Sequence, residues 1–539
     1  MSHFAGPDID LPPYSFVQYI FNHLDKRSED DDLAFIDDTQ NKNVSYKELR
    51  KQSIQFANNL RNFVNLKKGD VVTICSHSNV EYPVAILGVV GSGGVPCTAN
   101  HLYSKEELNY VLKDTQSTVL ITSAEYLEKY ILACEGTNVS AIVVTETESV
   151  KNANSSFQLY NFSELTKGTF DALPQFDIDA KNDILCILYS SGTTGRSKGV
   201  ALTHASGLLS NIALEKSHFI DVGDVVFAVP PFSHIYGLYI CVFLSIRVNA
   251  ALVFQKRFNY SGFLSAIEKY QANVLMLVPP IIVHFAKDVN TNNYDLSSVK
   301  LVATGAAPLA KELIQILSTK FKNPKYKFTQ GYGLTECGAV LTTTSKDTTL
   351  DLLSSGSVGK LIDGTEAMIV EITSRKLLPI GEDGEIICKS KGNMKNYINN
   401  VKMTQDSFEE RDGELWLKTG DIGHCNADGY FWISDRLKEL IKYKGYQVPP
   451  AELEELLLTH PSVKDCAVIG IKDESAGELP KAYVVLDSQN PTTEDDLKEL
   501  VKQKVAPYKQ LKGGVQFTDV IPKSPSGKIL RRVLRDQNI

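Results

Sequence analysis

The chain has 539 residues and a net charge of −8 with no basic tract, which argues against a primary role in nucleic-acid binding. Its length exceeds what one hydrophobic core usually serves, so we expect more than one domain. The nine cysteines are odd in number and include no CxxC pair. This pattern predicts free thiols in a reducing compartment and argues against a disulfide framework or a zinc site.

No targeting segment or membrane span is evident in the sequence. The first residues lack the basic and apolar regions of a secretory signal, and the last four, DQNI, are not an SKL-type peroxisomal ending. The longest apolar stretch, residues 235–254, is interrupted by Arg247 and Asn249. We therefore expect a buried helix and strand there rather than a membrane span, and a cytoplasmic protein.

Strand-like and helix-like runs alternate over residues 33–374. Strand-like runs fall at residues 71–75, 119–121, 141–144 and 301–303, and helix-like runs at residues 45–60 and 310–321. This alternation predicts an α/β architecture with mainly parallel sheets. Met276 and Leu277 lie in another apolar run, and we expect them in the core rather than in a site.

The pattern of strand-like and helix-like runs changes twice toward the C-terminus. From residue 384, short strand-like runs with tight turns predict a β-rich subdomain. After Asp435, a mixture of amphipathic helices and strands predicts a separate α+β unit. We therefore expect a large N-terminal domain (residues 1–434) of stacked, mainly parallel sheets with helices plus a β-rich subdomain. A small, mobile α+β C-terminal domain (residues 435–539) would follow, with its hinge at Asp435.

The segment at residues 189–200, YSSGTTGRSKGV, is the strongest single indication of function. Glycines let the backbone approach a ligand closely, and free N–H groups with hydroxyls form an anion site. The segment is not an ordinary P-loop, because Ser197 precedes and Gly199 follows Lys198. A flexible linker is the alternative, but the apolar strand expected at residues 184–188 disfavours it. The segment therefore predicts a loop that wraps a polyphosphate.

Four further motifs follow this loop along the chain. They are QGYGLTECG at residues 330–338, TGDI at 419–422, SDRLKELIKYKGYQV at 434–448 and PKSPSGKILRR at 522–532. In this order, the five motifs closely resemble the adenylate-forming superfamily of acyl-CoA synthetases, luciferases and peptide-synthetase adenylation domains. The closest resemblance is to the 4-coumarate–CoA ligase-like branch, and it extends over residues 33–532.

The resemblance implies a role for each matching residue in the first half-reaction. The phosphates of ATP would be held by Ser190, Ser191, Gly192, Thr193, Thr194, Gly195 and Lys198, with Thr335 at the α-phosphate and Glu336 at Mg²⁺. The adenine and acyl adenylate would lie along Gln330, Gly331 and Tyr332, and the ribose at Asp421 and Arg436. His234 would gate the acyl site, and the acyl group would be bounded by Tyr236, Gly305, Ala306 and Ala339. Lys528 would bridge the carboxylate and the α-phosphate, which suits a mobile point charge on a long stem.

For the second half-reaction, the resemblance implies a rotation of the C-terminal domain about Asp435. Lys528 would leave the site, and the segment around residues 442–445 would enter it. The adenylate would then contact Lys438 and Lys442, and coenzyme A would contact Lys444, Gly445 and Arg257.

Each assignment has a structural alternative. In these alternatives Glu336 is a solvated acid at a helix N-terminus, Asp421 caps a turn, His234 is a satisfied core residue, and Lys528 belongs to a solvated charged run. Three positions also depart from the family pattern. Asn249 and Asn396 replace common glycines, a change that asparagine tolerates best at positive φ, and Ala339 replaces a proline of many plant coumarate ligases.

The activity implied is an ATP- and Mg²⁺-dependent ligation of a carboxylic acid to coenzyme A through an acyl adenylate. A 4-coumarate-type hydroxycinnamate is the leading candidate acid, and a medium- or long-chain fatty acid is the second. A luciferase-like monooxygenase and a non-catalytic scaffold on the same fold are the alternatives from other classes. A non-catalytic scaffold would be expected to have lost the charged residues of the site, which this chain retains. No carrier module is appended, and no obligate protein partner is evident.

Overall fold

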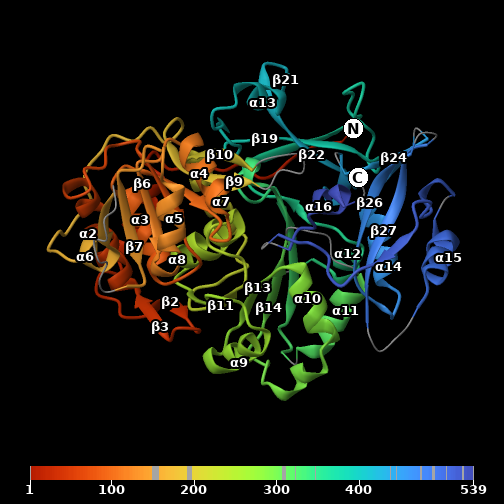
Figure 1. The fold of residues 1–539 in the computed structure, drawn as a ribbon, viewed down its shortest axis with the longest axis horizontal. Coiled ribbons are helices and arrows are strands. Elements are labelled where there is room, and N and C mark those ends of the chain that lie inside the picture. The colour runs from red at the N-terminus through yellow and green to blue at the C-terminus, as the bar shows by residue number, and fades with distance from the viewer. Residues whose placement is uncertain are drawn as a thin grey trace.

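A computed structural model gives the fold, which is shown in Figure 1. It describes residues 2–147, 157–190, 197–305, 311–321, 323–345, 348–437, 439–444, 446–473, 476–487, 492–505, 507–524 and 527–537. Within these ranges the strands form four sheets. In this view the C-terminal sheet (blue) lies at the right and the first sheet of the chain (orange) at the left.

The first sheet has eight strands. Their order is β20 (Asn396–Tyr397), β10 (Lys198–Thr203), β9 (Ile184–Ser190), β5 (Val95–Ala99), β4 (Val71–Cys75), β6 (Val119–Ser123), β7 (Ala141–Thr145) and β8 (Gln158–Asn161). All pairs from β9 to β8 are parallel, and β10 and β20 continue the sheet antiparallel. The strands predicted at residues 71–75, 119–121 and 141–144 are thus confirmed.

The second sheet has nine strands, and the ends of three of them form part of the cavity described below. Their order is β17 (Lys360–Leu361), β16 (Thr342–Thr343), β15 (Lys327–Tyr332), β14 (Leu301–Thr304), β13 (Val274–Leu277), β11 (Val225–Ala228), β12 (Ala251–Phe254), β2 (Leu33–Asp37) and β3 (Lys42–Ser45). Neighbours from β15 to β2 are parallel. Val274 and Met276 face the core shared with the first sheet, and Leu275 and Leu277 face a second core. Both faces are therefore buried, as a parallel sheet requires.

Helices cover these sheets and fill the space between them. They are α1 (Phe16–Asp25), α2 (Tyr46–Asn62), α3 (Glu81–Gly91), α4 (Lys105–Asp114), α5 (Leu127–Ala133), α6 (Phe162–Leu165), α7 (His204–Lys216), α8 (Leu244–Val248), α9 (Tyr260–Tyr270), α10 (Pro279–Lys287), α11 (Lys311–Lys320) and α12 (Leu350–Ser354). The capping box of Ser45 and Glu48 starts α2, which confirms the helix predicted at residues 45–60. Its residues Leu49, Phe56 and Leu60 are fully buried in the main core.

The apolar stretch at residues 235–254 folds as two short helices and a strand. A π-helix at Tyr236–Phe243 continues into α8, which ends at Asn249 with a left-handed φ of 57°, and β12 follows. No helix in the described part of the chain is long and apolar enough to cross a bilayer. Asn249 thus fills a glycine-like position as expected, whereas Asn396 lies in β20 without a positive φ.

The β-rich subdomain is a six-stranded antiparallel sheet. It consists of β1 (His3–Ala5), β18 (Thr365–Val370), β19 (Gly384–Ser390), β22 (Glu414–Cys425), β21 (Phe408–Arg411) and β23 (Phe431–Arg436), with the short helix α13 (Val401–Asp406) beside it. The N-terminal strand β1 was not predicted. It pairs with β18, so residues 3–5 and residues 365–370, far apart in the sequence, lie in one sheet.

The last residues form a sheet and core of their own. The sheet contains β25 (Tyr446–Val448), β24 (Ile441–Tyr443), β27 (Gly477–Leu486), β26 (Val463–Asp473) and β28 (Val515–Phe517), and the helices are α14 (Pro450–Leu458), α15 (Glu494–Lys504) and α16 (Arg531–Asp536). Leu453 and Leu457 are fully buried on α14, and a capping box of Thr493 and Asp496 starts α15. The α+β character predicted for this part of the chain is therefore confirmed.

Candidate functional site

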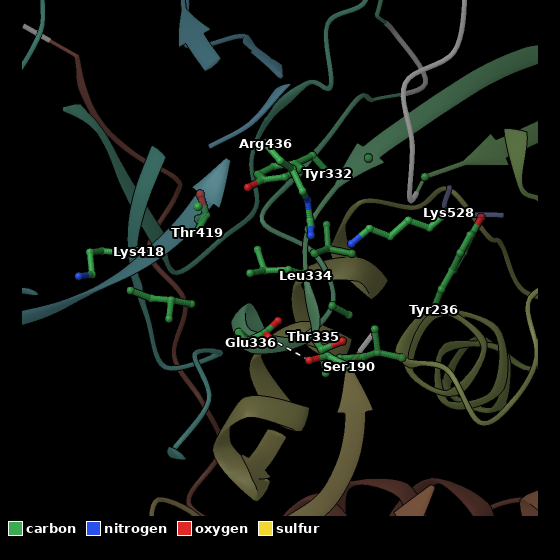
Figure 2. A pocket seen from close by; sticks show the side chains of 18 of the residues that line it. Ser190, Tyr236, Tyr332, Leu334, Thr335, Glu336, Lys418, Thr419, Arg436 and Lys528 are labelled. Atoms are coloured by element: carbon green, nitrogen blue, oxygen red, sulfur yellow. Dashed lines mark hydrogen bonds between the residues drawn. The ribbon is translucent and has the colours of Figure 1, made fainter. Parts of the chain in front are cut away.

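A cavity of about 830 Å³ lies where three of the sheets and the C-terminal segment meet. Its walls come from β9, β10, the carboxyl ends of β13, β14 and β15, the β-rich sheet and the segment that bears Lys528. Ligands of parallel α/β sheets bind outside the carboxyl ends of the strands. The cavity therefore occupies the place where the fold predicts a binding site (Figure 2).

The end of β15 gives the cavity its glycine-rich wall. Gln330 is buried and its Nε2 donates to the Ser357 carbonyl at 2.6 Å. A Cβ on Gly333 would lie 2.0 Å from the Ala339 carbonyl oxygen, so only glycine fits there. Gly331 and Tyr332 also line the cavity, as the sequence predicted.

Glu336 is held by two hydroxyl groups. Its Oε1 accepts hydrogen bonds from Ser190 Oγ at 3.1 Å and from the Tyr397 hydroxyl at 2.8 Å. The Lys198 ammonium lies 5.2 Å from the centre of the Tyr397 ring, so a cation and a carboxylate flank this tyrosine. Thr335, the residue before Glu336, is buried in the same wall. The carboxylate is thus fixed in the cavity rather than solvated at the surface.

Asp421 is only 2 % exposed and is paired at both oxygens. Arg436 Nε lies 2.9 Å from Oδ1, and the Tyr332 hydroxyl donates to Oδ2 at 2.7 Å. Asp421 and Arg436 are direct neighbours across β22 and β23, so the strand register sets the ion pair. Burial raises the pKa of Asp421, and the Arg436 guanidinium opposes that rise. These partners argue against a role of Asp421 as a turn cap.

Lys528 enters the cavity from a small turn of the C-terminal segment. Its backbone N–H donates to Ser524 Oγ at 3.1 Å, and its carbonyl accepts from Ser524 N–H at 2.8 Å. Gly527, at a φ of 83°, packs against Pro280 of α10, where a Cβ would lie 2.9 Å from Pro280 Cδ. Figure 2 shows the ends of the Arg436 and Lys528 side chains directed into the same space.

The charges around Lys528 perturb two groups in this cavity. Burial, and then Arg436, lower the pKa of Lys528 to about 8, while nearby carboxylates oppose the change. Burial and Lys528 lower the pKa of His234 to about 4, so His234 is neutral at pH 7. His234 Nδ1 accepts the backbone N–H of Tyr236 at 3.3 Å. His234 thus lies in the cavity close to Lys528.

The other predicted residues are distributed differently. Lys442 and Lys444 are exposed on and after β24, and neither lines the cavity. Arg257 is also exposed, outside the cavity, and forms an ion pair with Glu125. The predicted residues that fall outside the described ranges are Ser191, Gly192, Thr193, Thr194, Gly195, Ala306, Lys438 and Gly445. Among the described residues, those assigned to the first half-reaction therefore line one cavity, except Asp421, which is buried and paired with the lining residue Arg436, whereas Lys442, Lys444 and Arg257 lie outside it.

Two lining residues differ from what the sequence suggested, and a third, Ala339, lines the cavity as predicted but has an unexpected backbone conformation. Tyr397 was not predicted, because nothing in the run NYINN marks its hydroxyl as a partner of Glu336. Met276 is fully buried as expected but also lines the cavity. Ala339 lines it with a φ of 95°, a value that a proline, fixed near −65°, cannot adopt. Gly305 lines the cavity as predicted.

Comparison with known proteins identifies the family. The model of the family described as AMP-binding enzyme matches residues 22–398, and that of the AMP-binding enzyme C-terminal domain matches residues 452–528. The chain is 36 % identical to 4-coumarate-CoA ligase 1 of Narcissus pseudonarcissus over 537 residues, which are 98 % of this chain and 95 % of the relative. It is also 36 % identical to 4-coumarate–CoA ligase 1 of Petroselinum crispum over 536 residues, 98 % of this chain and 95 % of the relative.

Solved structures show the same fold. The anthranilate CoA ligase AuaEII in complex with anthranoyl-AMP has a TM-score of 0.85 and 25 % identity, covering 98 % of both chains. ATP-bound MatB from Rhodopseudomonas palustris has a TM-score of 0.84 and 26 % identity, covering 97 % of this chain and 98 % of the other. The chain belongs to the AMP-binding enzymes, the adenylate-forming superfamily, in its 4-coumarate–CoA ligase-like branch.

Proposed function

We propose that this protein is an ATP-dependent acid–CoA ligase that works through an acyl adenylate. One observation carries the proposal: Lys528, from the C-terminal segment, reaches the cavity that is also lined by Glu336 and by Arg436, whose guanidinium is paired with the buried Asp421. Three separate parts of the chain thus supply charges of both signs around one space. Adenylation of a carboxylic acid needs such an arrangement, because negative charge accumulates on crowded oxygens as the reaction proceeds.

In the first half-reaction, a carboxylate oxygen of the acid attacks the α-phosphorus of ATP, and pyrophosphate leaves. With a pKa of about 8, Lys528 is roughly nine-tenths protonated at pH 7. Its ammonium can therefore hold the carboxylate against the α-phosphate without donating a proton. Asp421 and Arg436 would fix the ribose, and Thr335 the α-phosphate. No protein nucleophile takes part, so the residues act by positioning and charge.

Glu336 fits the role of a Mg²⁺ ligand. Mg²⁺ in nucleotide sites is usually held by one or two carboxylates and completed by phosphates and water. The two hydrogen bonds to Oε1 fix the orientation of the Glu336 carboxylate. The described residues contain no cluster of three or more metal-binding side chains. Around Glu336, phosphate oxygens of ATP would therefore have to complete the coordination that these residues do not supply. Mg²⁺ would supply charge neutralisation for the leaving pyrophosphate.

In the second half-reaction, the thiol of coenzyme A displaces AMP from the adenylate. Lys442 and Lys444 lie outside the cavity in this structure. A rotation of residues 435–539 about Asp435 would move Lys528 out of the cavity and bring Lys442 and Lys444 toward it. Lys438 and Gly445 would move with them, and coenzyme A would then also contact Arg257. Asp435 is suited to hold one orientation, because its carboxylate accepts the backbone N–H groups of Arg436 and Ala451.

Restricting this hinge should separate the two half-reactions. An Asp435→Pro variant should still form the adenylate but lose at least about 10-fold in thioester formation, since proline limits the backbone rotation. Asp435→Ala is the matched control, because it loses the same side-chain hydrogen bonds and keeps the backbone free. Equal losses of both half-reactions in the proline variant alone would contradict the hinge.

A 4-coumarate-type hydroxycinnamate is the first candidate acid, because the curated relatives with 36 % identity carry that name. A medium- or long-chain fatty acid is the second, and the apolar side chains among the lining residues of the cavity favour it. The test is a screen for CoA-dependent pyrophosphate release over cinnamates, benzoates and fatty acids. Lys528→Ala is the negative variant, and Lys512→Ala, an exposed lysine in the same domain, is the matched control. If no acid gives release above the Lys528→Ala background, the ligase proposal fails.

A further inference from the structure

The chain on either side of Lys528 is tied to the rest of the C-terminal domain at two points. Lys523 and Ile529 form an antiparallel bridge, so they lie side by side. Lys523 Nζ lies 2.6 Å from Asp465 Oδ2 of β26, but both side chains are partly exposed, and a pair of this kind contributes little. The second tie is Arg531, the first residue of α16, which is buried.

The Arg531 guanidinium is shared by two buried carboxylates. Its Nη1 lies 2.5 Å from Glu439 Oε2, its Nη2 lies 2.7 Å from Glu454 Oε2, and its Nε donates to the Val468 carbonyl at 3.2 Å. Glu454 belongs to α14 and also accepts the Val468 N–H at 2.7 Å, so these contacts stay within the C-terminal domain. Breaking a buried pair leaves a charge without a partner, so these groups are held in one geometry.

Glu439 makes a different connection. It stands two residues after Leu437, whose N–H donates to the Gly420 carbonyl of the β-rich sheet at 2.8 Å. The Glu439 N–H itself donates to the Arg436 carbonyl at 2.9 Å, which places Glu439 directly behind a residue of the nucleotide cavity. The Arg531–Glu439 pair therefore links the segment that carries Lys528 to the point where the chain leaves the N-terminal domain.

Glu439 also faces Lys528 itself. Both line a second cavity, of about 1210 Å³, which lies between α4 and α16 and shares Lys528 with the nucleotide cavity. The charged and titratable groups around the Lys528 amine are Arg436, Glu439, Asp421, Glu336 and His234. Burial and then Arg436 lower the pKa of Lys528, and Glu439 is the foremost of the carboxylates that oppose them.

We propose that Glu439 and Arg531 are positioning residues for adenylation, and that their ion pair fixes the Lys528 amine beside Arg436. The inference rests on the proposed ligase function and adds two residues to its first half-reaction. Neither residue lines the nucleotide cavity, so both act through Lys528. A misplacement of a reacting group by about 1 Å can lower a rate by about 100-fold. Lys528 is expected outside the site in the second half-reaction, so the pair should have no effect there.

Isosteric variants of the two carboxylates separate positioning from a structural role. Glu439→Gln and Glu454→Gln each remove one negative charge from the same guanidinium, but only Glu439 adjoins Arg436 and Lys528. We expect Glu439→Gln to lower kcat for pyrophosphate exchange by about 10-fold or more, with KM for ATP changed less than about 2-fold. Thioester formation from a supplied acyl adenylate should be retained. Glu454→Gln should change both half-reactions by the same factor.

The pH dependence of adenylation is a second measurement that a loss of stability would not move. Without the Glu439 carboxylate the pKa of Lys528 should fall further, so the active ammonium form should be lost at lower pH. The alkaline limb of the pH profile should therefore move down by about 0.5 pH unit or more in Glu439→Gln and stay in place in Glu454→Gln.

The ratio of the two half-reactions compares activities of one preparation, so it is independent of any loss of folded protein. An unchanged ratio or an unmoved alkaline limb in Glu439→Gln would overturn the inference and leave the ligase function standing. The same change of ratio in Glu454→Gln would also overturn it, because the effect would then belong to the buried cluster as a whole. A wild-type enzyme that activates no acid would overturn the ligase proposal and this inference with it.

Discussion

Ala339 stores backbone strain in the wall of the cavity. Its φ is 95°, and its N–H donates to the Leu334 carbonyl at 3.3 Å. An alanine in a left-handed conformation destabilises the folded state by about 1–2 kcal/mol. A glycine would relieve this strain, but the greater freedom of the unfolded chain would take back about 0.4–1 kcal/mol of the gain. Ala339→Gly should therefore be stabilising by roughly 0.5–1 kcal/mol. Ala339→Pro should cost at least about 3 kcal/mol, because proline can supply neither this φ nor the N–H donor.

Thermal unfolding measures both changes. In large domains Tm changes by about 2 °C per kcal/mol. Ala339→Pro should therefore lower Tm by roughly 5 °C or more, whereas Ala339→Gly should raise it by about 1–2 °C. Lys105→Pro is the matched control, because Lys105 is the exposed first residue of α4, a position where helices accept proline. A proline at residue 339 that leaves both Tm and pyrophosphate release unchanged would refute the conformation described here.

Two further predictions concern Lys528 and the turn that carries it. Because the pKa of Lys528 is about 8 and the protonated amine is the active form, the rate of adenylation should fall by about 10-fold for each pH unit well above 8. A rate measured by pyrophosphate exchange that stays constant to pH 10 would contradict this. Gly527→Ala should lower adenylation by about 10-fold or more, since its Cβ would lie 2.9 Å from Pro280 Cδ and φ is 83°. Thioester formation from a supplied adenylate should be unaffected, and an equal loss in both assays would count against docking through Pro280.

Local sequence patterns were enough to predict the repeating elements of the fold. Apolar runs such as residues 71–75 and 301–303 specify strands buried on both faces, and the capping residue Ser45 specifies the start of α2. The N-terminal strand β1 could not be predicted this way. Its three residues carry no strong pattern, and its partners, Glu366 to Met368, are distant in sequence. Such a strand exists only because β18 offers a free edge.

Many of the residues that line the cavity could be named from the sequence, but their geometry could not. Asp421 and Arg436 were each assigned to the ribose, yet their mutual ion pair depends on the register of β22 and β23. The role of Tyr397 as a donor to Glu336 depends on the path of the chain between β19 and β22. The positive φ of Ala339 is likewise a result of packing, since alanine itself disfavours it.

The central claim is that Lys528 serves adenylation and is dispensable for the second half-reaction. The most direct measurement compares the two half-reactions in Lys528→Ala, with pyrophosphate exchange for the first and AMP release from a synthetic acyl adenylate and coenzyme A for the second. We predict a loss of at least about 100-fold in the first and less than about 3-fold in the second. Equal losses in both half-reactions, or an unimpaired first half-reaction, would contradict the account.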